Sequence, residues 1–190
     1  MRFVFYLLMM ISVALGVGFG LSYYALTDGR LFGVAQVGPW HAWPDVGAHT
    51  PNPYTRGHLA RTAAFELGQA EGLEFVATTD SDGEALTRDC AYRIDGKTPL
   101  ATFWTLVAVD EDGINIAAPD VAPAMRSSGI ARADDGSIII NVGTNLLPQN
   151  WLELTGEGPF KLVLTLYDTA AFSGFSSDAS MPSIIRGDCA

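Results

Sequence analysis

The three histidines of the chain lie close together in sequence, at His41, His49 and His58. Neutral imidazole is a common zinc ligand, so a metal site is the most specific chemistry that this region could carry. The spacings of eight and nine residues match no compact zinc pattern, however, and no cysteine joins them. The pattern favours an arm whose Trp40 and Trp43 pack on a folded domain or lie near lipid headgroups. We therefore expect no metal site and no cofactor.

Two acidic clusters, Asp80–Gly83 and Asp110–Gly113, could suggest calcium, because hard cations prefer several carboxylates on a tight loop. Neither cluster supplies a third acidic position or the closing bidentate glutamate of an EF-hand loop. Asp-Gly is, in contrast, a typical turn sequence between strands. The clusters are predicted to be hairpin turns.

Enzymatic motifs are weak. No Gly-x-Ser-x-Gly elbow, Walker loop or dinucleotide fingerprint is present, so no catalytic residue is assigned. A hydrolase with Glu153 or Glu157 as acid and base beside Trp151 stays open as an alternative. It would require two carboxylates roughly 5 to 10 Å apart, one with a raised pKa.

The only two cysteines are Cys90 and Cys189. In an exported domain, an even pair is expected to form a disulfide rather than two free thiols. A nucleophilic Cys90 is the alternative, but it would need a neighbouring base, and none is evident in the sequence.

Aromatic residues recur on the expected strands and could line an apolar pocket with one arginine as its polar group. The residues of this candidate ligand site are Tyr92, Arg93, Trp104, Trp151 and Tyr167. The alternative is that the aromatic rings simply belong to the core.

The elements that would position these residues begin with residues 3–26, which contain no charged side chain and exceed the roughly 20 residues that cross a bilayer as a helix. Residues 1–26 are therefore predicted to be a transmembrane signal anchor. A cleaved signal peptide is the alternative. Arg2 before the segment and Asp28 after it favour a cytoplasmic N-terminus.

Residues 27–53 are dense in glycine and proline, which predicts an irregular arm. The one helix expected beyond it is capped by Thr55 and ends near Gly68. Its apolar stripe consists of Leu59, Ala63 and Leu67. Arg56 and Arg61 lie on its polar sides, where exposure to solvent is favoured over binding of an anionic ligand.

Residues 54–190 are predicted to form a β-sandwich or barrel, because short runs of period two alternate with Asp-Gly turns. The expected strands are residues 73–79, 91–94, 102–109, 114–117, 137–142 and 160–167, with a short edge strand at 184–186. Residues 102–109 are apolar on both faces and are predicted to be a central, doubly covered strand. Residues 147–168 are expected to form a hairpin around Gly156 and Gly158.

Net charge excludes one class of partner. The chain has 11 Lys+Arg and 21 Asp+Glu, a formal charge of −10. Such a surface repels phosphate backbones and anionic headgroups, so nucleic-acid binding and electrostatic adhesion to lipid are disfavoured.

Seven short motifs in order resemble the domain-of-unknown-function family 1214. They are Thr78–Gly83, Tyr92–Ile94, Phe103–Leu106, Asp134–Ser137, Asn150–Leu152, Gly158–Phe160 and Leu164–Tyr167, within a match from about Tyr54 to Asp168. The resemblance implies a jelly-roll β-sandwich, usually in bacterial envelope or secreted proteins. The resemblance also implies that larger relatives have a second domain, which we expect the membrane segment to replace in this chain. An arginine frequent before the final tyrosine is absent, and no catalytic residue carries over.

Together these observations predict a mainly β, antiparallel sandwich with one short helix packed on it. We expect a single-pass inner-membrane protein with its domain in the periplasm, acting as a binding or assembly module for a protein or a small apolar ligand. A hydrolase of an envelope polymer or small ester, or an apolar-ligand carrier, is the alternative.

Overall fold

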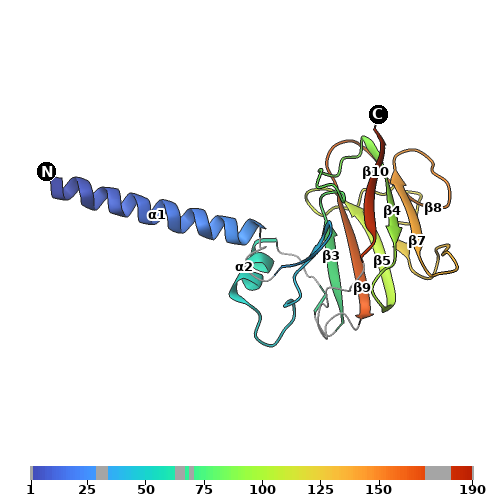
Figure 1. Cartoon of the computed structure of the whole chain (residues 1–190), viewed down its shortest axis with the longest axis horizontal. Helices are drawn as coiled ribbons and strands as arrows, with labels where there is room; N and C mark the ends of the chain where they lie inside the picture. Colours follow the sequence, from blue (N-terminus) through green and yellow to red (C-terminus); the bar gives the residue numbers. More distant parts are fainter. Residues whose placement is uncertain (1, 29–33, 63–66, 69–70, 170–180, 190) are drawn as a thin grey trace.

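The structure is a computed structural model that describes residues 2–28, 34–62, 67–68, 71–169 and 181–189. A long helix, α1 (Arg2–Asp28), projects from a domain of two β-sheets, and a short helix, α2 (Pro53–Thr62), lies between α1 and the sheets (Figure 1). The predicted class, mainly β with one helix on the domain and one apolar helix before it, is confirmed.

The larger sheet has six strands in the order β1-β2-β3-β9-β5-β6. Their bounds are β1 (Ala35–Val37), β2 (Trp40–Ala42), β3 (Gly72–Ala77), β9 (Lys161–Thr169), β5 (Ala101–Val109) and β6 (Met125–Arg126). All of its pairs are antiparallel.

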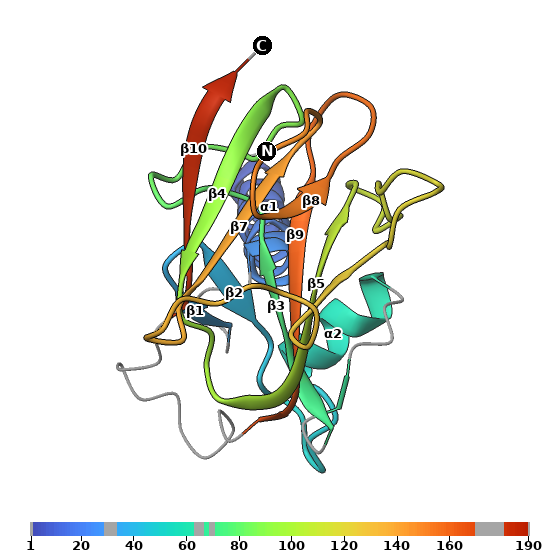
Figure 2. The same ribbon diagram turned by 90° about the vertical axis from the view of Figure 1, so that its right-hand side faces the viewer.

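The smaller sheet has four strands in the order β10-β4-β7-β8. They are β10 (Ser183–Cys189), β4 (Cys90–Gly96), β7 (Ile138–Gly143) and β8 (Asn150–Glu153). The pair β7–β8 is parallel and the other two pairs are antiparallel. Figure 2 looks onto this sheet, with the larger sheet and α1 behind it.

The core lies between the sheets and follows from the period of two along each strand. In the larger sheet Phe75 and Leu106 both pair with Leu164, and all three are buried. In the smaller sheet Ile184 and Ile140 flank Ile94 in the same way. The two buried rows belong to one hydrophobic cluster, which holds the sheets face to face.

The predicted hairpin at residues 147–168 is wrong. β8 runs parallel to β7 in the smaller sheet, while β9 lies in the larger one. Leu152 and Leu154 bury their side chains in the core, and the Gly156–Gly158 turn then carries the chain across the sandwich. Arg88 holds this crossing by donating to the carbonyls of Thr155, Gly158 and Pro159.

Residues 102–109 are not doubly covered. In β5, the buried Trp104, Leu106 and Ala108 alternate with half-buried Phe103 and Val107 on the outer face. The outer residues are apolar too, so the sequence pattern alone could not show that one face remains partly open. Residues 114–117 form no strand and contribute one isolated bridge, between Val109 and Asn115.

The helix prediction needs one correction, and the arm another. α2 begins at Pro53, and Asn52 rather than Thr55 caps it, since Asn52 Oδ1 accepts a hydrogen bond from the Tyr54 amide at 2.9 Å. Thr55 is buried within the helix instead. The expected stripe residue Ala63 lies outside the described residues. The arm is not irregular throughout, because β1 and β2 extend the larger sheet and bury Trp40.

Candidate functional site

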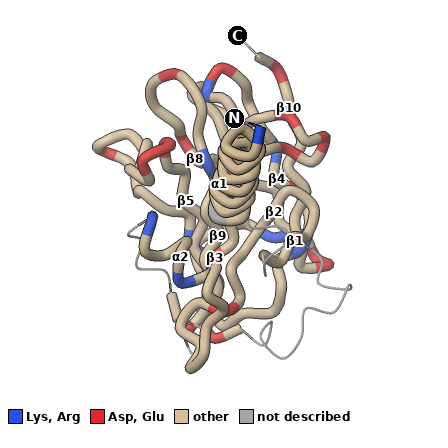
Figure 3. Tube along the Cα trace, turned by 90° about the vertical axis from the view of Figure 1, so that its left-hand side faces the viewer, with Lys and Arg blue, Asp and Glu red and all other residues tan. Residues whose placement is uncertain are grey.

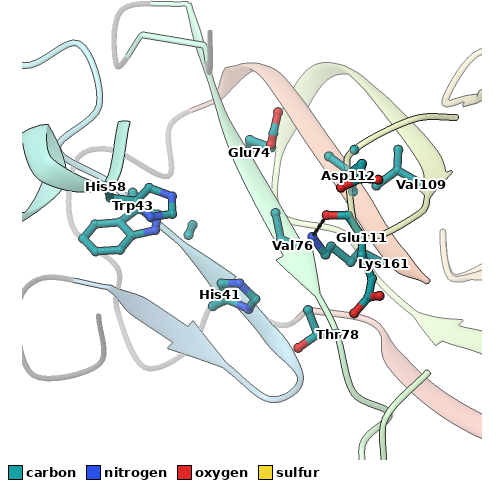
Figure 4. A pocket seen from close by; sticks show the side chains of 13 residues that line it. His41, Trp43, His58, Glu74, Val76, Thr78, Val109, Glu111, Asp112 and Lys161 are labelled. Atoms are coloured by element: carbon teal, nitrogen blue, oxygen red, sulfur yellow. Dashed lines mark hydrogen bonds between the residues drawn. The ribbon is translucent and has the colours of Figure 1, made fainter. Parts of the chain in front are cut away.

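A cleft of about 500 Å³ opens on the outer face of the larger sheet. Its floor comes from β3 and β9, where Val76 pairs with Val163. These residues point away from the core because they alternate with the buried Phe75, Leu162 and Leu164. The two valines therefore make the centre of the floor apolar, although it lies outside the sandwich, and Glu74 and Lys161 of the same strands also line the cleft (Figure 4).

One wall is aromatic. The rings of Trp43 and His58 stack with centroids 4.4 Å apart and an interplanar angle of 19°. Trp43 follows β2 and His58 lies on α2, so the stack joins the arm to the helix. His41, on β2, lines the cleft beside this stack, while His49 is not among the lining residues.

The opposite wall is the turn after β5. Asp110 Oδ1 accepts hydrogen bonds from the amides of Asp112 and Ile114, at 3.0 and 2.8 Å, and Gly113 completes the turn at a φ of 82°. Lys161 Nζ donates to the Glu111 carbonyl oxygen at 2.7 Å (Figure 4). The second acidic cluster of the sequence is thus a turn, as predicted, and it also borders the cleft.

Acidic groups predominate among the charged side chains of the cleft. Glu74, Glu111 and Asp112 supply three carboxylates, against the single ammonium of Lys161. With apolar side chains on the floor and an aromatic wall, this lining suits a ligand that has an apolar body and a positive charge. Among the described residues, no group of three His, Cys, Asp or Glu side chains is placed to hold a metal ion.

The five residues of the predicted ligand site do not converge. Tyr92 and Trp104 are buried between the sheets, where the Tyr92 ring meets Phe160 edge to face at 5.7 Å. The Tyr92 hydroxyl accepts a hydrogen bond from the Thr87 amide at 2.9 Å. These two rings are therefore core residues, which was the alternative interpretation.

The other three predicted residues lie on two different outer faces. Arg93 and Trp151 share the outer face of the smaller sheet. Arg93 on β4 and Trp151 on β8 both pair with Asn141 of β7, the strand between them. Tyr167 lies on the outer face of the larger sheet, 5.7 Å from the Phe103 ring. Alternation sends neighbouring strand residues to opposite faces, so aromatic residues on different strands need not share a pocket.

The predicted disulfide between Cys90 and Cys189 is confirmed, across a sequence separation of 99. It pairs the end of β10 with the beginning of β4. Cys90 is therefore not a free nucleophile.

The two glutamates of the hydrolase alternative are not part of the cleft. Glu153 is half-buried on β8, and Glu157 is exposed in the crossing turn. The pKa values of the Asp80 and Asp135 carboxyl groups are both lowered, and neither residue lines the cleft. A general acid would need a shift in the opposite direction.

The cleft residues escaped the sequence analysis for a physical reason. The histidines were visible as a group, but only β-sheet register places His41 beside Val76 of β3. Likewise, Glu74 and Lys161 are 87 positions apart in the chain, and strand pairing alone brings β3 and β9 together. Alternation along each strand was the one signal that could have identified these side chains as outward-facing.

Comparisons with known proteins concern the fold and the family. The VPA0106 protein from Vibrio parahaemolyticus has a similar crystal structure, with a TM-score of 0.60 and 19% identity over 74% of this chain and 36% of that one. A crystal structure of an uncharacterized protein from Burkholderia cenocepacia gives a TM-score of 0.47 and 16% identity, over 88% of this chain and 39% of that one. This chain thus spans less than two fifths of either protein. The search of curated proteins found no match.

The sequence itself matches a family described as "Protein of unknown function (DUF1214)" over residues 71–171. The matched region runs from β3 through β9 and covers more than half of the 190 residues. The resemblance found in seven short motifs is thereby confirmed, and the chain belongs to the DUF1214 family.

Proposed function

We propose that this chain is a membrane-anchored, extracytoplasmic binding protein whose ligand site is the cleft on the outer face of the larger sheet. The observation that carries the proposal is the cleft itself. It has about 500 Å³ of space, an apolar floor, an aromatic wall and an excess of carboxylates. This combination of an apolar lining with a few polar groups is typical of small-ligand sites.

Membrane anchoring rests on α1. Within Arg2–Ala25, the most apolar window of 18 residues has a mean hydropathy of 2.2, and none of that window is buried inside the protein. At 27 residues, α1 is long enough to cross a hydrocarbon layer of about 30 Å at a rise of about 1.5 Å per residue. A signal sequence would have the same composition, so retention of α1 in the mature protein is part of the proposal.

The proposed location is the inner membrane, with the N-terminus in the cytoplasm and the sandwich in the periplasm. Two features support it. Arg2 precedes the span and Asp28 follows it, in agreement with the positive-inside rule. The Cys90–Cys189 disulfide is also of the kind that persists in oxidising compartments. Alkaline phosphatase fused after Ala190 should therefore be active in bacteria, whereas an inactive fusion would indicate that the sandwich lies in the cytoplasm.

The proposed ligand is a small amphiphile with an amine or similar cation. Its apolar body would lie on Val76 and Val163, and its charge would face the carboxylates of Glu74 and Glu111. Phenethylamine is a suitable probe, and 3-phenylpropanoate, which has a comparable apolar body and the opposite charge, is its control.

The test is a titration of the full-length protein in nanodiscs with each probe, in which binding is monitored by the NMR signals of isotope-labelled histidines. The chain has three histidines, of which His41 and His58 line the cleft and His49 does not. Phenethylamine should shift the first two signals and leave that of His49 in place, while 3-phenylpropanoate should have a much weaker effect. Glu74→Gln should reduce the affinity for the amine roughly fivefold to tenfold, because one charge-assisted contact is lost.

Asp89→Asn, on the loop before β4, is the matched control because it removes an acidic charge outside the cleft. Equal shifts of all three histidines, or equal binding of the two probes, would overturn the assignment of the cleft as a cation-binding site.

A further inference from the structure

Helix α2 is a basic element in an acidic protein. Its sequence, Pro53–Thr62, contains Arg56 and Arg61 and no acidic residue, whereas the whole chain has a formal charge of −10. The average charge disfavours adhesion to anionic lipid, but the screening length in physiological salt is only about 8 Å. A local patch can therefore act independently of the average.

The two arginines flank the side of α2 that lies opposite the buried Thr55. Thr55 is buried, with 1% of its surface exposed. At about 100° per residue, Arg56 and Arg61 lie about 100° and 240° from Thr55, one on each side of the opposite face. Tyr54 and Ala60 are exposed on the same side of the helix.

This side of α2 lies beside the C-terminal end of the apolar stretch of α1. The Arg61 guanidinium is 5.3 Å from the centroid of the Tyr23 ring, and the two helices are in contact. Tyr23 and Tyr24 are exposed near the end of α1, where tyrosines of transmembrane helices favour the headgroup region. Figure 3 looks along α1 onto this side of the domain, with α2 beside it.

We propose that α2 docks on anionic lipid headgroups at the outer surface of the membrane, with Arg56 and Arg61 as the contacting residues. The inference rests on the proposed anchoring, because α1 brings α2 to that depth. Charge complementarity selects anionic headgroups over zwitterionic ones. His58 lies on the same helix and lines the cleft, so docking would hold the cleft beside the membrane surface.

The test is hydrogen exchange, measured by mass spectrometry, of the full-length protein in two kinds of nanodisc. One contains phosphatidylcholine alone, and the other contains phosphatidylcholine with phosphatidylglycerol. Peptides covering residues 53–62 should exchange more slowly in the anionic nanodisc, by roughly fivefold for each arginine. The difference should disappear in about 1 M salt, where the screening length is about 3 Å.

The double variant Arg56→Gln/Arg61→Gln should abolish the difference between the lipids. Arg93→Gln/Lys97→Gln is the matched control, since it removes two positive charges from half-exposed ion pairs at the smaller sheet. This control should leave the exchange of α2 unchanged.

Peptides from α1 separate failure of docking from failure of anchoring. If α1 is protected in both lipids but α2 exchanges equally in both, the anchor stands and docking is overturned. If α1 is not protected, anchoring fails and docking fails with it. A lipid effect that persists in Arg56→Gln/Arg61→Gln would also contradict the assignment.

Discussion

Arg186 Nε donates a hydrogen bond to Asp80 Oδ2 at 2.8 Å and so ties the edge strand β10 to the turn that follows β3. Asp80 is almost fully buried, whereas 27% of the Arg186 side chain is exposed. Ser81 strengthens the junction, because its amide donates to the Ile184 carbonyl and its Oγ accepts from the Ile184 amide, both at 2.9 Å. The contact fastens the two sheets together at one edge of the sandwich.

Replacement of Asp80 should destabilise the domain because it leaves Arg186 without its carboxylate. Asp80→Ala is expected to lower the free energy of unfolding by about 3 kcal/mol, measured by urea denaturation of the full-length protein in detergent. The acidic turn after β5 offers a control. There Asp110 accepts the equivalent pair of amide hydrogen bonds, from Asp112 and Ile114, but none of the described arginines pairs with its carboxylate.

Asp110→Ala is therefore expected to cost only about 1 kcal/mol, the value of the turn hydrogen bonds alone. The difference between the two variants isolates the Arg186 contact. Equal losses would show that the contact with Arg186 adds nothing to stability.

Acid should weaken the fold in a way that depends on Asp80. Burial alone would raise the pKa of this carboxyl, but hydrogen bonds from Arg186 and from the Glu84 and Asp82 amides outweigh burial, and the pKa is lowered below 3.8. Between the folded and unfolded pKa values the unfolded chain binds more protons, so stability is full above about pH 4 and falls as the pH decreases. Asp80→Asn should have a shallower fall below pH 4, measured as urea midpoints at a series of pH values.

Asp135 should add to the same acid sensitivity. Hydrogen bonds from the Ser137 hydroxyl and amide lower the pKa of this exposed carboxyl to about 2. Its stabilising effect is thus present above about pH 4 and is lost as the pH falls toward 2. Ser137→Ala should raise the pKa of Asp135, as measured by NMR titration, whereas an unchanged pKa would remove Ser137 as the cause.

The disulfide should contribute strongly to stability because it closes most of the domain. For a sequence separation of 99, the chain-entropy model gives about 4 to 5 kcal/mol at most. The protein purified without reductant should be two hydrogens lighter than its reduced mass, and Cys90→Ser/Cys189→Ser should unfold at lower urea. If the variant unfolds at the same urea concentration as the wild type, removal of the disulfide does not raise the entropy of the denatured chain as the model expects.

Gly72 allows close contact between β3 and β9. It pairs with Tyr167 in β9, and a Cβ at this position would overlap the carbonyl oxygen of Leu166. Gly72→Ala should therefore force the strands apart and cost about 1 to 3 kcal/mol in thermal or urea unfolding. Gly129→Ala is the control, since its Cβ would meet only the Arg126 carbonyl oxygen at 3.9 Å, and a change of less than about 0.5 kcal/mol is expected.

Local patterns in the sequence determined much of the architecture. The uncharged run of residues 3–26 identified α1, because the composition of a single segment decides whether it can cross a bilayer. Alternation identified β4, β5, β7 and β9, and the pairs Asp82–Gly83, Asp112–Gly113 and Asp135–Gly136 identified turns. The pair Asp95–Gly96, also predicted to be a turn, instead belongs to β4. The two cysteines likewise predicted their own bridge.

Tertiary structure alone decided which strands pair and which side chains meet. Alternation shows that a strand has two faces, but not which neighbour it takes, so β8 was assigned to β9 rather than to β7. For the same reason, the predicted ligand site distributes its five residues over three surfaces. The cleft that the chain does form gathers residues from His41 to Val163, because register and long-range packing, not nearness in sequence, bring them together.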